Sequence, residues 1–262
     1  MKLKSIARDF VPHSVRLKLN VYEALRHGEP ELHTLPALCN PGRTSLDVGA
    51  SRGIYASRMQ DYSLRVLAFE PQPYYADFVR KALPRVEVME CAVSDAEADA
   101  VLNVPTEVND AGMAYIGSRT QPPVNATLQI TVRSLTIDSL KLSGIGFIKI
   151  DVEGHELAVL RGGERTIARE QPNLLIEAEE RHRPDAVASV STFLLAYGYS
   201  GWFLSGRTLH PIAEFDPGLH QNPEALDLRS RNANGGKPPY INNFIFVQPG
   251  SVAALQDVVR RR

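Results

Sequence analysis

A dense group of ionisable side chains follows an apolar run in the middle of the chain. The run ends in four side chains that can carry charge or exchange protons, Asp151, Glu153, His155 and Glu156. The run predicts a buried strand over 147–151, and the residues after the acids predict a helix over 157–170. Ligands of open α/β sheets bind at the carboxyl ends of the strands. We therefore expect this strand-to-helix turn to be the centre of the chemistry.

A structural interpretation of the same residues is also open. Asp151 could cap the N-terminus of the following helix, and Glu153 and Glu156 could complement its dipole. Glu156 fits this interpretation best, because its position suits the first turn of a helix. Capping alone accounts poorly for Asp151 and His155 together, so these two residues are the main candidates for the chemistry.

A turn containing glycine follows the first predicted strand. Asp47 precedes the turn, which holds Gly49, Ala50 and Gly53. Glycine lets the backbone approach a ligand closely, and the start of the next helix offers free N–H groups. The spacing is not the G-x-G-x-x-G of dinucleotide sites, and the acid would repel a pyrophosphate but attract a ligand with cationic groups. This motif alone leaves open both a nucleotide-like cofactor and a plain tight turn.

The next two strands end in residues that suit an adenosine group. Glu70 ends the second strand, where an acid about 20 residues after the first turn can bond ribose hydroxyls, and Pro71 stops that strand. In the third strand, Ala92 could flank an adenine and Asp95 could lie near its amino group. A surface glutamate and a plain turn are the structural alternatives. The glycine turn and Glu70 together favour cofactor binding.

Strands and helices alternate along the chain, which predicts an α/β fold with a mostly parallel sheet and helices on both faces. Two shorter strands, 100–104 and 128–132, flank a loop over 105–126 and could form a hairpin-like excursion. Loops of this length in compact domains are usually functional or mobile. The predicted core strands are 45–48, 65–70, 86–93, 147–151, 173–178, 201–204 and 244–247, and the predicted helices of this region are 54–60, 74–83, 157–170 and 184–197.

The ends of the chain are expected to lie outside the main domain, which spans 44–250. Residues 1–43 predict a helical N-terminal extension packed on that domain, and 251–262 predict a C-terminal tail with a solvated basic end. Apolar residues recur at helical spacing in the extension, at Val15, Leu19, Tyr22 and Leu25. Gly28 and the proline after it should end this helix.

Composition predicts a soluble, cytoplasmic protein. The chain has 262 residues, 44% of them hydrophobic, which suits one large domain with an appendage. The formal net charge of -1 provides no global electrostatic footprint for nucleic acid. Cys39 and Cys91 offer neither a disulfide framework nor a metal-ligand spacing. No run approaches the ~18 apolar residues of a membrane span, and the N-terminus lacks the apolar stretch of a signal peptide.

Taken together, these motifs resemble the FkbM family of S-adenosylmethionine-dependent methyltransferases. The resemblance covers about 44–247 and rests on 46–50, 69–71, 92–95, 135–140 and, most specifically, 148–156 followed by 160–163. It implies the Rossmann-like class I methyltransferase fold, with a seven-stranded sheet whose last strand is antiparallel. It also implies an O-methyltransferase acting on hydroxyls of sugars, glycolipids or secondary metabolites, so the expected partner is a small-molecule or glycan acceptor. A homodimer is compatible with the sequence.

The resemblance implies roles for individual residues. The glycine turn would hold the methionine part of the cofactor, Glu70 would bind the ribose diol, and Ala92 would border the adenine. An acid-lined site suits the positive sulfonium and ammonium groups of this cofactor. By this resemblance the cofactor-binding residues are Asp47, Gly49, Ala50, Gly53, Glu70, Pro71, Ala92, Asp95 and Asp151.

The acceptor hydroxyl must lose its proton as it attacks the methyl group. Holding two reactants in line can contribute ~7–11 kcal/mol, and a positioned base adds about 10²–10⁴-fold. His155 is the first candidate for this base because an imidazole titrates near neutral pH. His182 is the second candidate, and Asp151 would face both cofactor and acceptor. Each histidine could also be a polar residue without a catalytic role.

Three alternatives to this scheme remain. A Mg²⁺ ion could acidify the hydroxyl, held by the carboxylates of Asp151, Glu153, Glu177 and Glu179, although we expect no resident metal. An NAD-dependent oxidoreductase could use the same type of sheet, but the dinucleotide fingerprint is missing. A non-catalytic module could bind the cofactor and methylate nothing, and fold alone does not separate this from an enzyme.

Overall fold

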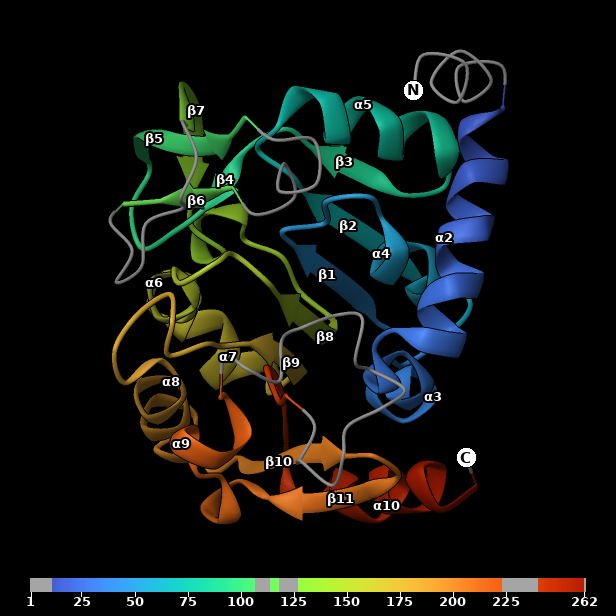
Figure 1. Cartoon of the computed structure of the whole chain (residues 1–262), viewed down its shortest axis with the longest axis vertical. Helices are drawn as coiled ribbons and strands as arrows, with labels where there is room; N and C mark the ends of the chain where they lie inside the picture. The colour runs from blue at the N-terminus through green and yellow to red at the C-terminus, as the bar shows by residue number, and fades with distance from the viewer. Residues whose placement is uncertain (1–10, 107–113, 118–126, 223–239, 262) are drawn as a thin grey trace.

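A large mixed sheet forms the centre of the molecule. The computed structural model describes residues 11–106, 114–117, 127–222 and 240–261. In chain order the strands of the large sheet are β1 (Thr44–Val48), β2 (Arg65–Phe69), β3 (Glu87–Met89), β8 (Ile145–Ile150), β9 (Asn173–Glu177), β10 (Ser200–Ser205), β11 (Thr208–Pro211) and β12 (Asn243–Val247). Their spatial order is β11-β10-β12-β9-β8-β1-β2-β3 (Figure 1). Because β9, β8, β1 and β2 are neighbours paired in parallel, their carboxyl ends lie together at one edge.

The strand pairing confirms the predicted class. The five strands from β9 to β3 are paired in parallel, and β12 runs antiparallel to both of its neighbours. The α/β fold of class I methyltransferases, with its antiparallel last strand, is thus confirmed. The number of strands is eight in the described residues and not seven. The additional strand, β11, arises because the chain reverses at Gly206 and pairs back on β10.

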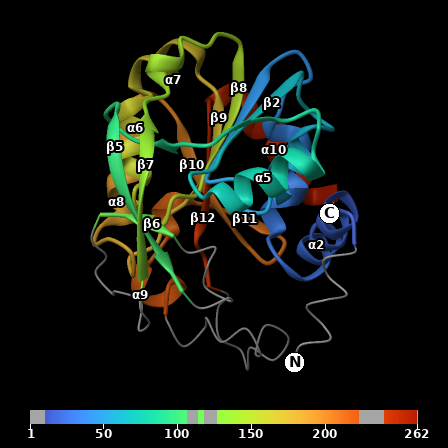
Figure 2. The same ribbon diagram turned by 90° about the horizontal axis from the view of Figure 1, so that it is seen from above.

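Helices cover both faces of the large sheet, as predicted (Figure 2). One face packs on α6 (Glu156–Gly162), α7 (Glu164–Glu170) and α8 (Ala186–Leu195). The other packs on α2 (His13–His27), η1 (Pro30–Thr34), α3 (Leu35–Leu38), α4 (Ile54–Met59), α5 (Pro73–Ala82) and α10 (Val252–Arg261). Because both faces are covered, every residue of β1 and β8 is buried. Burying a large apolar side chain contributes about 1.5–3 kcal/mol, so these strands give the site a rigid base.

A second, smaller sheet holds the excursion predicted between the third and fourth core strands. Its strands are β4 (Ala92–Val93), β5 (Ala98–Pro105), β6 (Tyr115–Ile116) and β7 (Thr127–Leu135), in the order β4-β7-β5-β6. The predicted hairpin-like pairing is confirmed, since β5 and β7 run antiparallel. Most of the predicted loop 105–126 lies outside the described residues.

Two predicted elements are divided in the structure. The expected strand 86–93 is split between the two sheets, because the chain turns where the Cys91 N–H bonds the Met89 carbonyl. The expected helix 157–170 is two helices that meet at Gly163, which packs tightly on Ile137. The remaining short elements are η2 (Asp138–Leu140), η3 (Ile212–Glu214), α9 (Pro217–His220) and η5 (Pro249–Ser251).

The N-terminal helix packs with a face that includes only Leu25 of the predicted stripe. Val15, Leu19 and Tyr22 are 44%, 58% and 56% exposed, whereas Leu17 is only 1% exposed and joins the core. A second apolar stripe, which begins at Leu17 and continues at i+4, i+7 and i+8, faces α4 and α5. At the other end, 252–261 form a helix that buries Leu255, where the sequence suggested a tail. None of the helices in the described ranges is long and apolar enough to cross a membrane.

Candidate functional site

The glycine turn after β1 brings three strand ends close together. The N–H groups of Gly49 and Ala50 bond the Phe69 carbonyl, at 3.0 and 3.1 Å. Gly49 has a φ of 83°, and a Cβ there would lie 1.8 Å from the backbone oxygen of Asp151. Only glycine therefore fits between the ends of β1 and β8. Gly53, with a φ of 75°, precedes α4 and packs on Val79, and it is not among the described lining residues of the two cavities at this end of the sheet.

A cavity lies over the carboxyl ends of the parallel strands. It brings together predicted cofactor residues (Gly49, Glu70, Pro71, Ala92 and Asp151) and His155. Asp95, also predicted to border the adenine, is not among the residues that line it. The full described lining is Val48, Gly49, Ser51, Phe69, Glu70, Pro71, Gln72, Cys91, Ala92, Val93, Leu102, Ala114, Tyr115, Ile116, Asp151, Val152, Glu153, His155 and Glu177.

The Glu70 carboxylate is fixed by the backbone. Its Oε2 accepts a hydrogen bond from the Ser51 N–H at 2.7 Å, and its Oε1 accepts one from the Gln72 N–H at 2.9 Å. Burial raises the pKa of Glu70 to about 7, although both N–H groups act to lower it. The carboxyl group thus sits at the cavity wall in a defined orientation.

Asp47 lies beneath the glycine turn, at a second cavity. Its Oδ2 accepts a hydrogen bond from the Ala56 N–H at 2.8 Å, and burial raises the pKa of Asp47 to about 7. This second cavity shares Gly49, Ser51 and Asp151 with the first one and is also lined by Glu29, Asp47, Ala50, Arg52, Ile54, Tyr55 and Lys149. The predicted cofactor residues are therefore divided between two adjoining cavities.

Asp151 belongs to the sheet edge and not to a helix cap. Its N–H bonds the Val48 carbonyl at 2.9 Å, which extends the β1–β8 pairing, and its carboxylate lines both cavities. The position before α6 is taken by His155, so the capping interpretation of Asp151 is wrong. Glu156 instead stabilises the turn itself, because its buried carboxyl accepts the Gly154 N–H at 2.7 Å.

His155 lines the first cavity and is oriented by a short hydrogen-bonded chain. Its Nε2 is 2.8 Å from the Ser94 hydroxyl, and that hydroxyl donates to Asp95 at 3.1 Å. Because a serine hydroxyl has a single proton, Ser94 must accept from Nε2–H, which leaves Nδ1 free to accept a proton. Burial lowers the pKa of His155, so the ring is neutral at pH 7. Asp95 thus accepts a hydrogen bond from the serine that orients this histidine.

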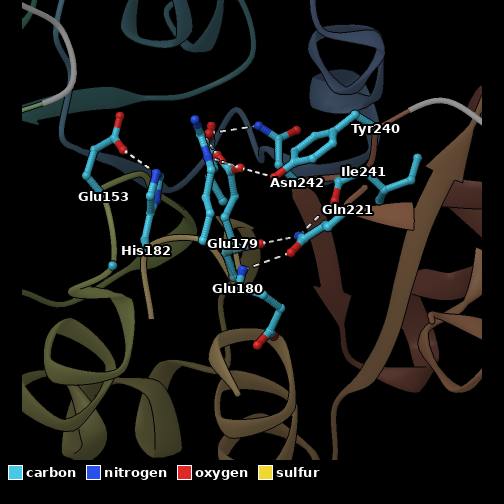
Figure 3. Close-up of polar contacts among 12 residues, drawn as sticks. Glu153, Glu179, Glu180, His182, Gln221, Tyr240, Ile241 and Asn242 are labelled. Atoms are coloured by element: carbon cyan, nitrogen blue, oxygen red, sulfur yellow. Dashed lines mark hydrogen bonds and ion pairs between the residues drawn. The ribbon is translucent and has the colours of Figure 1, made fainter. Parts of the chain in front are cut away.

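His182, the second candidate base, lies behind the cavity wall. It is 4% exposed, and its Nε2 is 3.2 Å from the Glu153 carboxylate, which does line the cavity (Figure 3). Gly154, the residue after Glu153, packs closely on this histidine, since a Cβ on Gly154 would lie 3.0 Å from the His182 Cβ. The structure therefore places His155, and not His182, at the cavity surface.

The carboxylates considered for Mg²⁺ have separate protein partners. Glu177 accepts a hydrogen bond from Asn242 at 2.8 Å, and Glu179 pairs with Arg181. Glu179 also accepts a hydrogen bond from the Tyr240 hydroxyl (Figure 3). Burial, followed by the Asp151 charge, raises the pKa of Glu177 well above its usual value. Among the residues that the structure describes, no group of three or more His, Cys, Asp or Glu side chains is placed to hold a metal ion.

Several site residues were not identified from the sequence. Ser51 and Gln72 donate hydrogen bonds to Glu70 from their backbone N–H groups, and a pattern of side chains cannot predict such bonds. Ser94 acts through a contact that spans 61 positions. Lys149 had a visible signal, since a charge inside the apolar run 147–150 is costly to bury without a purpose.

Comparisons with known proteins give the following matches. Residues 47–200, more than half of the chain, match the family described as methyltransferase FkbM domain. No curated protein matches the chain. Among solved structures, a methyltransferase FkbM from Methylobacillus flagellatus KT is 18% identical with a TM-score of 0.49, and the match covers 79% of this chain and 44% of that one. The chain thus spans less than half the length of that protein.

Two further solved structures are similar over most of both chains. An O-methyltransferase from Bacillus cereus in complex with SAH is 13% identical with a TM-score of 0.44, covering 93% of this chain and 94% of that one. An rRNA methylase from Streptococcus thermophilus is 10% identical with a TM-score of 0.48, covering 85% and 97%.

Proposed function

The chain belongs to the FkbM methyltransferase domain family, and we propose that it transfers a methyl group from S-adenosylmethionine to a hydroxyl of a small-molecule or glycan acceptor. The proposed acceptors are those that the family resemblance implies, namely sugars, glycolipids and secondary metabolites. The proposed catalytic unit is the domain 44–250. Membership of this family favours methyl transfer over the NAD-dependent oxidoreductase that the sheet type alone left open.

The buried Glu70 carboxylate is the observation that carries this proposal. Each of its oxygens already accepts one backbone N–H, and each carboxylate oxygen has a further lone pair for a ligand hydroxyl. An acid held rigidly at the end of the second strand, beside a glycine turn, is suited to bind a ribose diol.

The other groups in the two cavities fit the same cofactor. Ala92 and Pro71 offer small apolar walls for an adenine, and the turn at Gly49 allows close backbone approach. Asp47 and Asp151 suit the positive groups of the cofactor. When bound, S-adenosylmethionine supplies a methyl group on a positively charged sulfur. In this proposal Gly53 and Asp95 act indirectly, the first by starting α4 and the second through Ser94.

His155 is the proposed base for the acceptor hydroxyl. It lines the same cavity as Asp151, and the Ser94 contact holds its ring in one orientation. With Nε2–H donating to Ser94, the Nδ1 atom can accept the proton that the hydroxyl loses. Water or solvent buffer then removes this proton from the imidazole after each turnover.

Binding and product formation test the proposal separately. In calorimetry, the protein should bind S-adenosylhomocysteine and should not bind NAD. Incubating cell extracts with protein and methyl-labelled S-adenosylmethionine, followed by mass spectrometry, should reveal a hydroxylated species that gains one methyl group. Full activity in EDTA is expected, since no metal is assigned. Binding of NAD alone would contradict the proposed cofactor, and binding without any methylated product would favour the non-catalytic module.

Cofactor affinity should depend on pH. Burial places the pKa values of Asp47 and Glu70 at about 7 in the ligand-free protein, and both the ammonium group and the ribose hydroxyls favour ionised carboxylates. Binding should therefore lower these pKa values and release protons. The Kd for S-adenosylhomocysteine should fall from pH 6 to pH 8, by up to about tenfold per pH unit for each group that is linked to binding.

Calorimetry in two buffers measures this linkage directly. At pH 6.5, the heat of binding should differ between phosphate and imidazole buffers by the ionisation heat of the protons released. The Glu70→Gln variant should release fewer protons, because one of the two linked groups no longer titrates. A Kd that is flat from pH 6 to pH 8 would show that these carboxyls do not ionise on binding.

A further inference from the structure

Lys149 has an unusual environment in the second cavity. Its side chain is 1% exposed, and its Nζ makes no hydrogen bond to any residue in the described ranges. The ammonium group lies 5.0 Å from the centre of the Tyr55 ring and 3.5 Å from the Asp151 carboxylate. A buried cation with unused hydrogen-bond donors is costly to leave in place. These donors lie at the wall of a cavity.

Carboxylates outnumber cations around this lysine. Glu29, Asp47 and Asp151 line the same cavity as Lys149, and Arg52, the other cation in the lining, is exposed to solvent. The surrounding carboxylates raise the pKa of Lys149 despite the opposing effect of burial, so it stays charged. Burial and then the Glu29 charge raise the pKa of Tyr55, and Glu29 and Tyr55 line this same cavity. The cavity thus offers both a fixed positive group and several negative groups.

The position of this cavity links it to the proposed cofactor. Gly49, Ser51 and Asp151 line both cavities, and the Ser51 N–H bonds Glu70. A ligand whose ribose is held at Glu70 would therefore pass the glycine turn and reach the second cavity with its other end. In S-adenosylmethionine that end is an amino acid, with one carboxylate and one ammonium group.

We propose that Lys149 binds the α-carboxylate of the cofactor's amino-acid tail, while the facing carboxylates of Asp47, Asp151 and Glu29 bind its α-ammonium group. This inference rests on the proposed function, since it assigns one end of the same ligand. Lys149 thereby becomes the residue that distinguishes a cofactor with a complete amino-acid tail from a shortened nucleoside. The alternative is a structural role, in which Lys149 only neutralises the acids around it.

The wild-type protein provides a test that needs no substitution. Its affinity is measured by calorimetry for three ligands: S-adenosylhomocysteine, its decarboxylated form, which keeps the ammonium group, and 5′-methylthioadenosine, which has no amino-acid tail. Loss of a buried charged partner typically weakens binding by about 100-fold. The decarboxylated form should therefore bind about 100-fold more weakly than S-adenosylhomocysteine. Equal affinity for these two ligands would overturn the proposal.

Two variants then assign the effect to Lys149. Lys149→Met should weaken S-adenosylhomocysteine about 100-fold and leave 5′-methylthioadenosine unchanged, which also reports that the fold is intact. Lys149→Arg should retain part of the selectivity for the carboxylate. Arg52→Met is the comparison variant, since it removes the exposed cation of the same cavity and should keep the wild-type preference for S-adenosylhomocysteine over its decarboxylated form.

The outcomes separate this proposal from the one on which it rests. The assignment of Lys149 is wrong if Lys149→Met binds all three ligands more weakly by the same factor. It is also wrong if Arg52→Met, and not Lys149→Met, loses the preference for S-adenosylhomocysteine over its decarboxylated form. If Lys149→Met does not fold, the affinities of the three ligands for the wild type and for Lys149→Arg still test whether Lys149 binds the carboxylate. If the wild-type protein binds none of the three adenosine ligands, the proposed function itself fails.

Discussion

Replacing His155 with alanine should lower kcat by about 10²–10⁴-fold, the usual contribution of a positioned base. The Kd for S-adenosylhomocysteine should stay near the wild-type value, because Glu70 and the glycine turn remain intact. The loss of kcat is expected because the hydrogen bonds from Nε2 to Ser94 and from Ser94 to Asp95 leave the Nδ1 atom of His155 unprotonated at neutral pH, ready to accept a proton. Single-turnover rates with labelled cofactor, measured beside binding calorimetry, separate these two quantities.

The pH profile distinguishes a base from a residue that only shapes the cavity. Burial lowers the pKa of His155 below its usual value of 6.5, so wild-type kcat should fall only below about pH 6.5. In His155→Ala that acid limb should disappear along with most of the activity. Ser94→Ala should lower kcat less, because it removes the orienting contact and leaves the imidazole in place.

Two other histidines serve as comparisons for this variant. His210 pairs with Glu214, outside both cavity linings, and His210→Ala should have nearly wild-type kcat. His182 lies behind Glu153, so His182→Ala should lower stability more than kcat in the folded fraction. A strong loss of kcat in His182→Ala, with normal turnover in His155→Ala, would transfer the role of base to His182.

The sequence was sufficient to predict the site residues that follow a recognisable buried strand. Largely apolar runs such as 147–150, in which Lys149 is the one charged residue, predict buried parallel strands, and parallel pairing brings their carboxyl ends to one edge. Gly49 and Glu70 each follow such a strand directly, and His155 lies in the turn between such a strand and its helix. Their joint presence in one cavity could therefore be predicted without knowing how any side chain is oriented.

Packing partners could not be read from the sequence in the same way. In α2, two apolar stripes have helical spacing, and only contact with α4 and α5 decides that Leu17, and not Leu19, is buried. Likewise, residues 86–93 are uniformly suited to a strand, but the two ends of this segment pair with β2 and β7 in different sheets. Long-range competition of this kind overrides local pattern.

The side chains that support the site depend on contacts that are distant in sequence. Lys149 belongs to a strand, but Glu29, which acts on it, comes from the N-terminal segment and Tyr55 from α4. Asp95 was expected to border the adenine, and in the structure its carboxylate accepts a hydrogen bond from the Ser94 hydroxyl. Position in a motif therefore identified the region of the site more reliably than the role of each residue.

Gly49→Ala should be the most damaging single-methyl change in the chain's glycine turn. The new Cβ would lie 1.8 Å from the Asp151 oxygen, and alanine at a φ of 83° adds about 1–2 kcal/mol of strain. Relief requires the ends of β1 and β8 to separate, which would break the 2.9 Å bond from the Asp151 N–H to the Val48 carbonyl. We expect a loss of more than about 4 kcal/mol in the free energy of unfolding.

Urea denaturation measures this loss, and Gly206→Ala is the matched control. Gly206 also has a positive φ, 62°, but nothing lies within 4 Å of a Cβ placed there. The control therefore carries the backbone strain alone, about 1–2 kcal/mol, and the difference between the two variants isolates the clash with Asp151. Because that clash displaces Asp151, which lines both cavities, any folded Gly49→Ala protein should also fail to bind S-adenosylhomocysteine. If the two variants lose similar stability, a Cβ at position 49 fits between the ends of β1 and β8, and the close approach of these strand ends is not needed for the fold.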